Sequence, residues 1–126
     1  MILLDTNALI WLLTGSQQLG AVARTTIEAD LATCYVSQVS LWEIATKAAI
    51  GKLDLKLDVP QVIEKEGFSL LRLRNEHIKA YQKLPLLHRD PFDRMLIAQA
   101  QVEQVKLLTS DDIFKSYDAK IVDAKV

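Results

Sequence analysis

The stretch that decides the fold is residues 90–101, which read Asp90-Pro91-Phe92-Asp93-Arg94-Met95-Leu96-Ile97-Ala98-Gln99-Ala100-Gln101. An Asp before Pro at the head of an apolar run predicts a helix with Asp90 as N-cap and Pro91 in its first position, where a missing N–H costs nothing. The next two turns carry so few polar side chains that we expect this helix to pack against a sheet. Its first turn, which contains Asp93, would then border a cleft.

Asp93 has an ordinary explanation when it is taken alone. A carboxylate in the first turn accepts hydrogen bonds from unpaired N–H groups and complements the helix dipole, which stabilises the helix by about 0.3–1 kcal/mol. A functional role gains weight only because other acids in the chain hold comparable positions, at strand ends and helix starts. The interpretation of Asp93 therefore depends on where these other acids lie.

The composition indicates one globular domain spanning residues 1–126, long enough to bury about two-thirds of the surface of its unfolded chain. The 15 basic and 16 acidic residues give a net charge of -1, which neither requires nor excludes a nucleic-acid partner. The single Cys34 excludes a disulfide framework, so we expect a reducing, cytoplasmic location. We expect no membrane partner, because no apolar run reaches about 20 residues and Ile2-Leu3-Leu4 is too short for a signal peptide.

Short apolar runs predict strands at 2–4, 34–36, 69–73, 106–109 and 121–122. The segments between them predict helices at 8–13, 20–32, 40–50, 60–66 and 75–83, followed by the helix from 91. Strands that alternate with helices imply right-handed crossovers and a parallel sheet covered on both faces. The expected fold is therefore α/β, a three-layer α/β/α sandwich around a central parallel sheet.

Local patterns add detail to three of these segments. In helix 20–32 we expect Val22, Ile27 and Leu31 to face inward. Ser40-Leu41-Trp42-Glu43 has the S-x-x-E spacing of a capping box, which makes Glu43 a capping carboxylate or a partner of Lys47 four residues later. Residues 52–58 alternate with period two and form either an edge strand or an extended arm with three leucines packed beneath it.

Four acids are expected at one edge of this sheet. Asp5 and Asp111 end strands, while Glu43 and Asp93 begin helices, and in a parallel α/β sheet strand ends and helix starts share an edge. Asp5 could instead be only the N-cap of the helix that follows it. If the four carboxylates converge, two charges about 4 Å apart repel by about 4 kcal/mol at an effective dielectric near 20. A bound divalent cation would relieve that repulsion.

Oxygen ligands select Mg²⁺ or Mn²⁺ over Zn²⁺, and such an ion suits hydrolysis of a phosphodiester by an activated water. For the substrate, basic residues are enriched near the same edge: Arg72, Arg74, Lys79, Lys83, Arg89 and Arg94, with Lys47, Lys52 and Lys56. Any one of them could belong to an ordinary solvated face. We expect Arg94 to contact phosphate or to orient a carboxylate, and His88 to be structural rather than catalytic.

Four segments carry a resemblance to a known family: Leu4-Asp5-Thr6-Asn7, Ser40-Leu41-Trp42-Glu43-Ile44-Ala45, His88-Arg89-Asp90-Pro91-Phe92-Asp93-Arg94 with Leu96-Ile97-Ala98-Gln99-Ala100, and Thr109-Ser110-Asp111. In order, spacing and total length the chain resembles the PIN-domain ribonucleases, specifically the VapC-type toxins of bacterial toxin–antitoxin pairs. The resemblance implies a Mg²⁺- or Mn²⁺-dependent endoribonuclease that forms a homodimer and is inhibited by a small antitoxin. Substrates of such toxins include transfer RNA and ribosomal RNA.

The resemblance also assigns roles to residues. It implies that Asp5, Glu43, Asp93 and Asp111 are the catalytic acids and metal ligands, with Asp5 and Asp93 closest to the direct ligands. Thr6, Asn7 and Ser110 would contact substrate or support the ligands. The fourth acid is Asp111 or Asp112, and Asp111 is preferred because the family's acid lies two residues after the Thr.

Two other functions compete with this one. A haloacid-dehalogenase-like phosphatase would use Asp5 as a covalent nucleophile, but that family begins D-x-D and this chain has Asp5-Thr6-Asn7. A catalytically inactive RNA-binding module would use each acid only as a cap. In that case Asp93→Asn would cost about 1 kcal/mol of stability at most and change no activity.

Overall fold

The computed structural model describes residues 1–126. Its strands are β1 (Ile2–Leu4), β2 (Cys34–Ser37), β3 (Ser69–Leu71), β4 (Lys106–Thr109) and β5 (Ile121–Asp123). Its α-helices are α1 (Thr6–Thr14), α2 (Ala21–Ala29), α3 (Gln38–Ala49), α4 (Val59–Glu66), α5 (Asn75–Lys83) and α6 (Pro91–Glu103). Two 3₁₀ helices complete the chain, η1 (Leu31–Thr33) and η2 (Asp112–Ser116). No helix is both long enough and apolar enough to cross a membrane.

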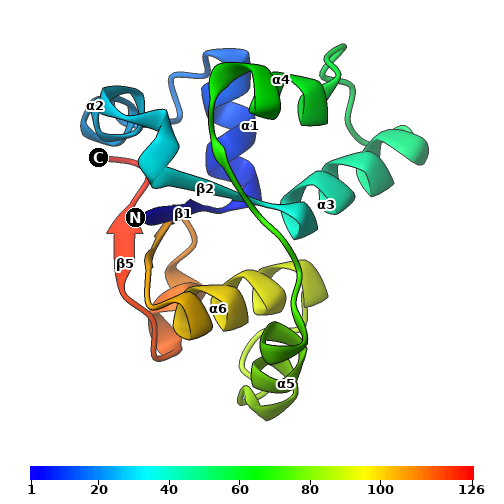
Figure 1. Ribbon diagram of the computed structural model, residues 1–126, viewed down its shortest axis with the longest axis vertical. Coiled ribbons are helices and arrows are strands. Elements are labelled where there is room, and N and C mark those ends of the chain that lie inside the picture. The colour runs from blue at the N-terminus through cyan, green and yellow to red at the C-terminus, as the bar shows by residue number, and fades with distance from the viewer.

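The five strands form one sheet in the order β3-β2-β1-β4-β5, and every neighbouring pair is parallel. β1 lies at the centre, where Leu3 pairs with Tyr35 of β2 and with Leu107 of β4. All five carboxyl ends therefore meet at one edge, and Figure 1 shows β1 and β2 running toward the helices α1 and α3 that begin there. The predicted parallel α/β sheet is confirmed.

A separate apolar core covers each face of the sheet. Successive residues of a strand point to opposite faces, so Leu4 packs with Leu9 and Ile27 while Leu3 packs with Leu96 and Phe114. Figure 1 shows α1, α2 and α4 on one side of the sheet and α5 and α6 on the other. The three-layer sandwich predicted from the sequence is thus confirmed, with α6 against the sheet as its apolar turns require.

Helix 20–32 is shorter than predicted. The chain becomes extended at Asp30, whose side chain accepts a hydrogen bond from Ala32 N and begins η1. The inward positions of α2 are Ala23 and Ile27, whereas Val22 is 61% exposed. The prediction that Val22 faces the core was therefore wrong, because the small Ala23 takes the position against the sheet.

The start of α3 also differs from the capping-box prediction. Ser37, the last residue of β2, is the N-cap, and its Oγ accepts a hydrogen bond from Val39 N at 3.0 Å. Ser40 therefore lies inside the helix, where its Oγ accepts a hydrogen bond from the Thr6 hydroxyl at 3.0 Å. Glu43 is left in the second turn of α3, too far from the helix start to act as a capping carboxylate.

Residues 52–58 form no strand and run as an irregular arm to α4. Leu53 and Leu55 are partly buried against the core that includes Ile27, but Leu57 is 46% exposed. Lys56 has a φ of 53°, which interrupts the extended alternation that a strand needs. Of the two alternatives left open by the sequence, the arm is correct, with two leucines rather than three beneath it.

Candidate active site

Asp5 connects the centre of the sheet to α1. Its backbone N–H donates to Leu108 O of β4 at 3.0 Å, and its Oδ1 accepts from Ala8 N at 2.7 Å as the N-cap of α1. The residue is only 4% exposed. Asp5 is therefore a helix cap, and capping uses only one of its two carboxylate oxygens.

Asp111 reaches the same edge from β4, two residues after the strand ends. Its N–H donates to Thr109 Oγ1 at 3.1 Å, and its Oδ1 accepts from Ile113 N as the N-cap of η2. The neighbouring Asp112 has a side chain that is 92% exposed and paired with Lys115. Of the two candidates for the fourth acid, the structure brings Asp111 to the other acids.

Glu43 supplies a buried carboxylate from α3. Its side chain is 5% exposed, and Oε2 accepts a hydrogen bond from Lys47 Nζ at 2.6 Å. Its other oxygen, Oε1, is buried without any hydrogen-bond partner. A carboxylate oxygen left unpaired away from water is costly, so this position is suited to an added positive ligand.

Asp93 enters from the first turn of α6, as the sequence predicts. Asp90 is the N-cap of this helix, with Oδ1 accepting from Phe92 N at 2.8 Å and from Asp93 N at 3.3 Å. Because Asp90 caps the helix, the Asp93 carboxylate is not needed as a cap. Asp93 Oδ2 instead lies 2.8 Å from His88 Nε2.

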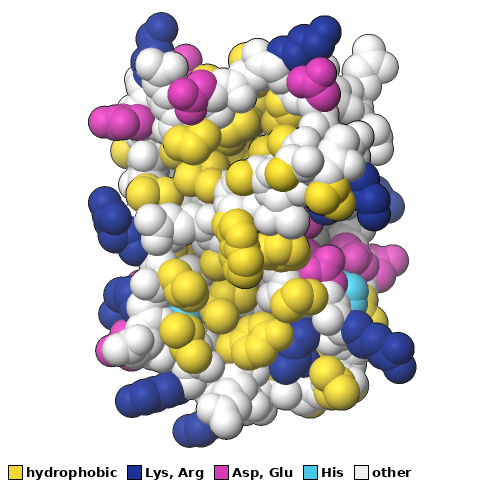
Figure 2. All heavy atoms as spheres, turned by 90° about the vertical axis from the view of Figure 1, so that its right-hand side faces the viewer, with side chains coloured by type: hydrophobic (Ala, Val, Ile, Leu, Met, Phe, Trp, Pro, Cys, Tyr) yellow, Lys and Arg dark blue, Asp and Glu magenta, His cyan; other side chains and the backbone are white.

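These side chains enclose one small pocket of about 80 Å³. Its walls are Asp5, Thr6, Asn7, Glu43, Lys47, Asp90, Asp93, Asp111 and Phe114. Figure 2 shows an acidic group beside a histidine on this side of the molecule, with basic side chains above and below it. The volume suits an ion with a few waters, since one water needs about 10–15 Å³ of such space.

Burial beside other acids shifts the pKa of two of them. The pKa of Asp5 is raised from 3.8 to about 6, chiefly by burial and to a smaller extent by nearby Glu43 and Asp111, while hydrogen bonds from Thr109 and Ala8 N act to lower it. Burial likewise raises the pKa of Asp93 to about 6, opposed chiefly by its hydrogen bond to His88. The two raised pKa values show that keeping both carboxylates ionised costs free energy unless a cation is present.

The donor set fits a hard divalent cation. All the oxygen atoms come from carboxylates, hydroxyls and an amide, which are ligands that Mg²⁺ and Mn²⁺ accept, and no Cys lies near. The orphaned Oε1 of Glu43 supplies the clearest sign of a missing positive partner. Asp5, Glu43, Asp93 and Asp111 are thus the residues that would hold the ion.

Two of the predicted site residues lie outside the pocket. Adjacent helical residues point about 100° apart, so Arg94 turns away from Asp93. It is buried, donates to Pro85 O at 3.0 Å and Tyr81 O at 3.3 Å, and stacks 4.8 Å from the centre of the Tyr81 ring. This placement gives Arg94 a structural task in place of the predicted phosphate contact. Ser110 is half-buried and does not line the pocket.

Lys47 and His88 join the site, although the sequence assigned neither of them a definite role there. Lys47 was expected near this edge as one of several basic residues, and as a partner four residues from Glu43 on the same helix. His88 lies on an irregular loop, where no periodicity indicates which way a side chain points. Its one sequence signal is its position just ahead of the Asp90-Pro91 helix start.

The protein is thus a parallel α/β sandwich with a cluster of carboxylates at the carboxyl ends of its strands. Residues 2–120 match the PIN domain family. The chain therefore belongs to the PIN domain family, as its sequence motifs predicted.

Solved structures with the same fold include toxin–antitoxin proteins. VapBC2 from Rickettsia felis, bound to a promoter DNA fragment, is similar with a TM-score of 0.76 at 18% identity over 97% of this chain and 98% of that one. FitAcB from Neisseria gonorrhoeae gives 0.73 at 19% identity, covering 98% of each chain. A toxin–antitoxin complex from Klebsiella pneumoniae gives 0.68 at 17% identity, again covering 98% of each. A search of curated proteins gives no match.

Proposed function

We propose that this protein is a divalent-metal-dependent endoribonuclease that acts as the toxin of a toxin–antitoxin pair. The observation that carries the proposal is the convergence of Asp5, Glu43, Asp93 and Asp111 on one pocket, with Glu43 Oε1 buried and unpaired. Membership of the PIN domain family removes the haloacid-dehalogenase-like alternative. The inactive RNA-binding module is the alternative that experiment must exclude.

In the proposed phosphodiester hydrolysis, the side chains of the pocket have different roles. When bound, Mg²⁺ or Mn²⁺ would lower the pKa of a water and stabilise the leaving oxygen. Asp5 and Asp93 would hold the ion from the centre of the sheet and the start of α6, while Glu43 and Asp111 complete the acidic wall. Lys47, fixed by Glu43, is a cation beside the acids and suited to a phosphate oxygen. Thr6 and Asn7 add a hydroxyl and an amide to the pocket lining.

Partners follow from the same proposal. Structured cellular RNA is the substrate, a small antitoxin protein is the inhibitor, and the cytoplasm is where they meet. Two of the structures with this fold are described as VapBC2 bound to promoter DNA and as a toxin–antitoxin complex. Figure 2 shows hydrophobic side chains gathered over the middle of the face that carries the acidic group. Exposed apolar residues such as Trp42, Leu86 and Leu87 support a protein partner or a homodimer.

The test is cleavage of total cellular RNA by the purified, antitoxin-free chain with Mg²⁺, with Mn²⁺ and with EDTA. Discrete fragments that require metal and disappear in Asp93→Asn support the nuclease, and sequencing of the cut ends identifies the RNA. Asp112→Asn is the matched control, because it changes an acid next to the site whose side chain is 92% exposed. No cleavage by a folded chain under either metal would refute the general ribonuclease and favour the binding module.

A further inference from the structure

His88 lies at the rim of the acidic pocket, on the loop between α5 and α6. Its Nε2 is 2.8 Å from Asp93 Oδ2, and one ligand atom from each of His88, Asp93 and Asp111 lies within 4.8 Å of the others. The imidazole is 23% exposed, so it remains accessible to an ion that enters from solvent. The sequence favoured a purely structural histidine, and this position suggests more.

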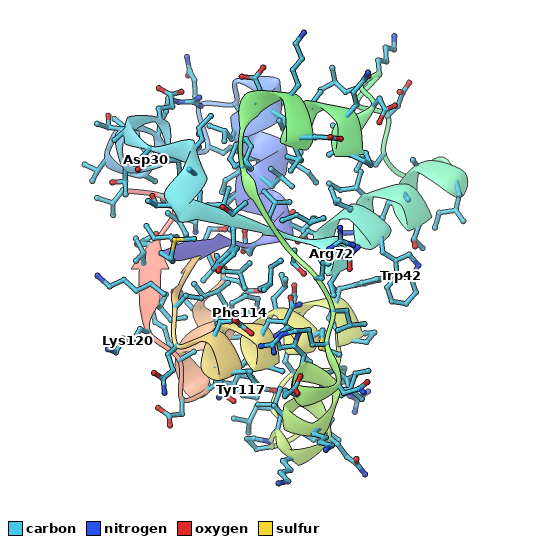
Figure 3. The ribbon with its side chains drawn as sticks, viewed as in Figure 1. Asp30, Trp42, Arg72, Phe114, Tyr117 and Lys120 are labelled. Atoms are coloured by element: carbon cyan, nitrogen blue, oxygen red, sulfur yellow. The ribbon has the colours of Figure 1, made fainter.

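The loop that carries His88 is fixed by the segment that also carries Asp111. The Tyr117 hydroxyl accepts hydrogen bonds from His88 N at 2.8 Å and from Leu87 N at 3.2 Å. The Phe114 ring, fully buried, lies 6.3 Å from the imidazole centre. Figure 3 labels both aromatic residues, which lie on the same side of the sheet as α6. The hydrogen bonds to Tyr117 therefore fix the loop backbone at His88, and the imidazole lies between Asp93 and the Phe114 ring.

We propose that His88 is a nitrogen ligand of the divalent ion and that it shifts the site's preference from Mg²⁺ toward a first-row transition ion such as Mn²⁺. This inference rests on the proposed metal-dependent function. Adjacent ligands of an octahedral ion with bonds of about 2.1 Å are about 3 Å apart, so the observed 2.8 Å suits a shared ion as well as a hydrogen bond. The unpaired Glu43 Oε1 independently indicates that a cation belongs in this pocket.

Ligand type gives the proposal its chemical consequence. Mg²⁺ takes oxygen ligands and keeps several waters, whereas imidazole nitrogen is a common ligand of transition-metal ions. A pocket of four carboxylates alone would accept Mg²⁺ and Mn²⁺ with little distinction. One added nitrogen makes it a mixed nitrogen–oxygen site, in which the transition ion gains a contact that Mg²⁺ does not favour.

Pulsed electron paramagnetic resonance of Mn²⁺ bound to the metal-free chain tests the ligand directly. We expect a directly coupled nitrogen in the wild type, identified by comparing ¹⁴N and ¹⁵N protein, and its loss in His88→Gln. Gln is the matched replacement, because its amide can still donate a hydrogen bond to Asp93. The only other histidine, His77, is fully buried between α5 and α6 and stays in both proteins.

Calorimetric titration with each ion tests the preference. We expect His88→Gln to lower Mn²⁺ affinity by about tenfold or more and Mg²⁺ affinity by less than about threefold. Bound Mn²⁺ without a coupled nitrogen, or an equal loss for both ions, would overturn the assignment of His88. If Mn²⁺ still bound and required Asp93, the proposed function would stand. A wild-type chain that binds no Mn²⁺ would overturn both.

Discussion

Replacing Asp5 by Asn should stabilise the metal-free protein near neutral pH. Burial and neighbouring acids raise the pKa of Asp5 from 3.8 to about 6. Each unit is worth about 1.4 kcal/mol, so keeping this carboxylate ionised in the fold costs about 3 kcal/mol at most. Asn has nearly the same shape and can still accept the hydrogen bond from Ala8 N. It removes the charge without removing the helix cap.

The sign of this effect depends on pH. A carboxyl whose folded pKa is raised contributes stability that is present below about pH 3.8 and is lost as pH rises through about 6. At pH 7.5 we therefore expect Asp5→Asn to exceed the wild type by about 1–3 kcal/mol in free energy of unfolding. At pH 4 the folded wild type is protonated at this site, and the difference should nearly vanish.

Urea unfolding of metal-free protein at pH 4 and pH 7.5, followed by circular dichroism, measures both values. Asp112→Asn is the control, because its side chain is 92% exposed and its removal should give no pH-dependent change. An Asp5→Asn protein that is no more stable than the wild type at pH 7.5 would refute the account of a strained acidic cluster. The same difference at both pH values would also refute it, since it would point to packing rather than charge.

Three further predictions follow from the structure. Mn²⁺ should raise the melting temperature of the wild type more at pH 7.5 than at pH 5, because protons compete for Asp5 and Asp93 whose pKa values lie near 6, and equal shifts in thermal scans would contradict this. Arg94→Leu should lower unfolding free energy by about 1–3 kcal/mol through loss of its bonds to Pro85 O and Tyr81 O, as urea unfolding would show, whereas the salt dependence of RNA binding should not change. Gly20→Ala should displace residues 125–126, because an added Cβ would lie 2.1 Å from the carbonyl carbon of Val126. The hydrogen bond from Val22 N to Val126 O should then break, so amide exchange at Val22 should accelerate, and an unchanged exchange rate would contradict this.

Features carried by local patterns were predictable from the sequence. The alternation of apolar strands with capped helices gave the parallel sandwich, and the Asp90-Pro91 pair located the start of α6 to the residue. The same logic brought Asp5, Asp93 and Asp111 to one edge, because strand ends and helix starts share it in any parallel sheet. These predictions needed no knowledge of how distant side chains pack.

Features that depend on packing between elements were not predictable. Ser37 and Ser40 are both plausible caps, and only the end of β2 decides that Ser37 begins α3. Arg94 follows Asp93 directly, yet one step around the helix turns it into the cleft between α5 and α6. His88 reaches the acids through contacts with Tyr117, which lies 29 residues later in the chain.

The strand order has a consequence for how the chain is made. β1, which is synthesised first, sits between β2 and β4, and its second neighbour emerges from the ribosome only after most of the chain. Asp111 follows β4, so the four carboxylates cannot come together on a nascent chain that lacks residues 106–126. Under the proposed nuclease function, late closure of the sheet would keep each incomplete translation product inactive, so the order of the strands would decide when activity can begin.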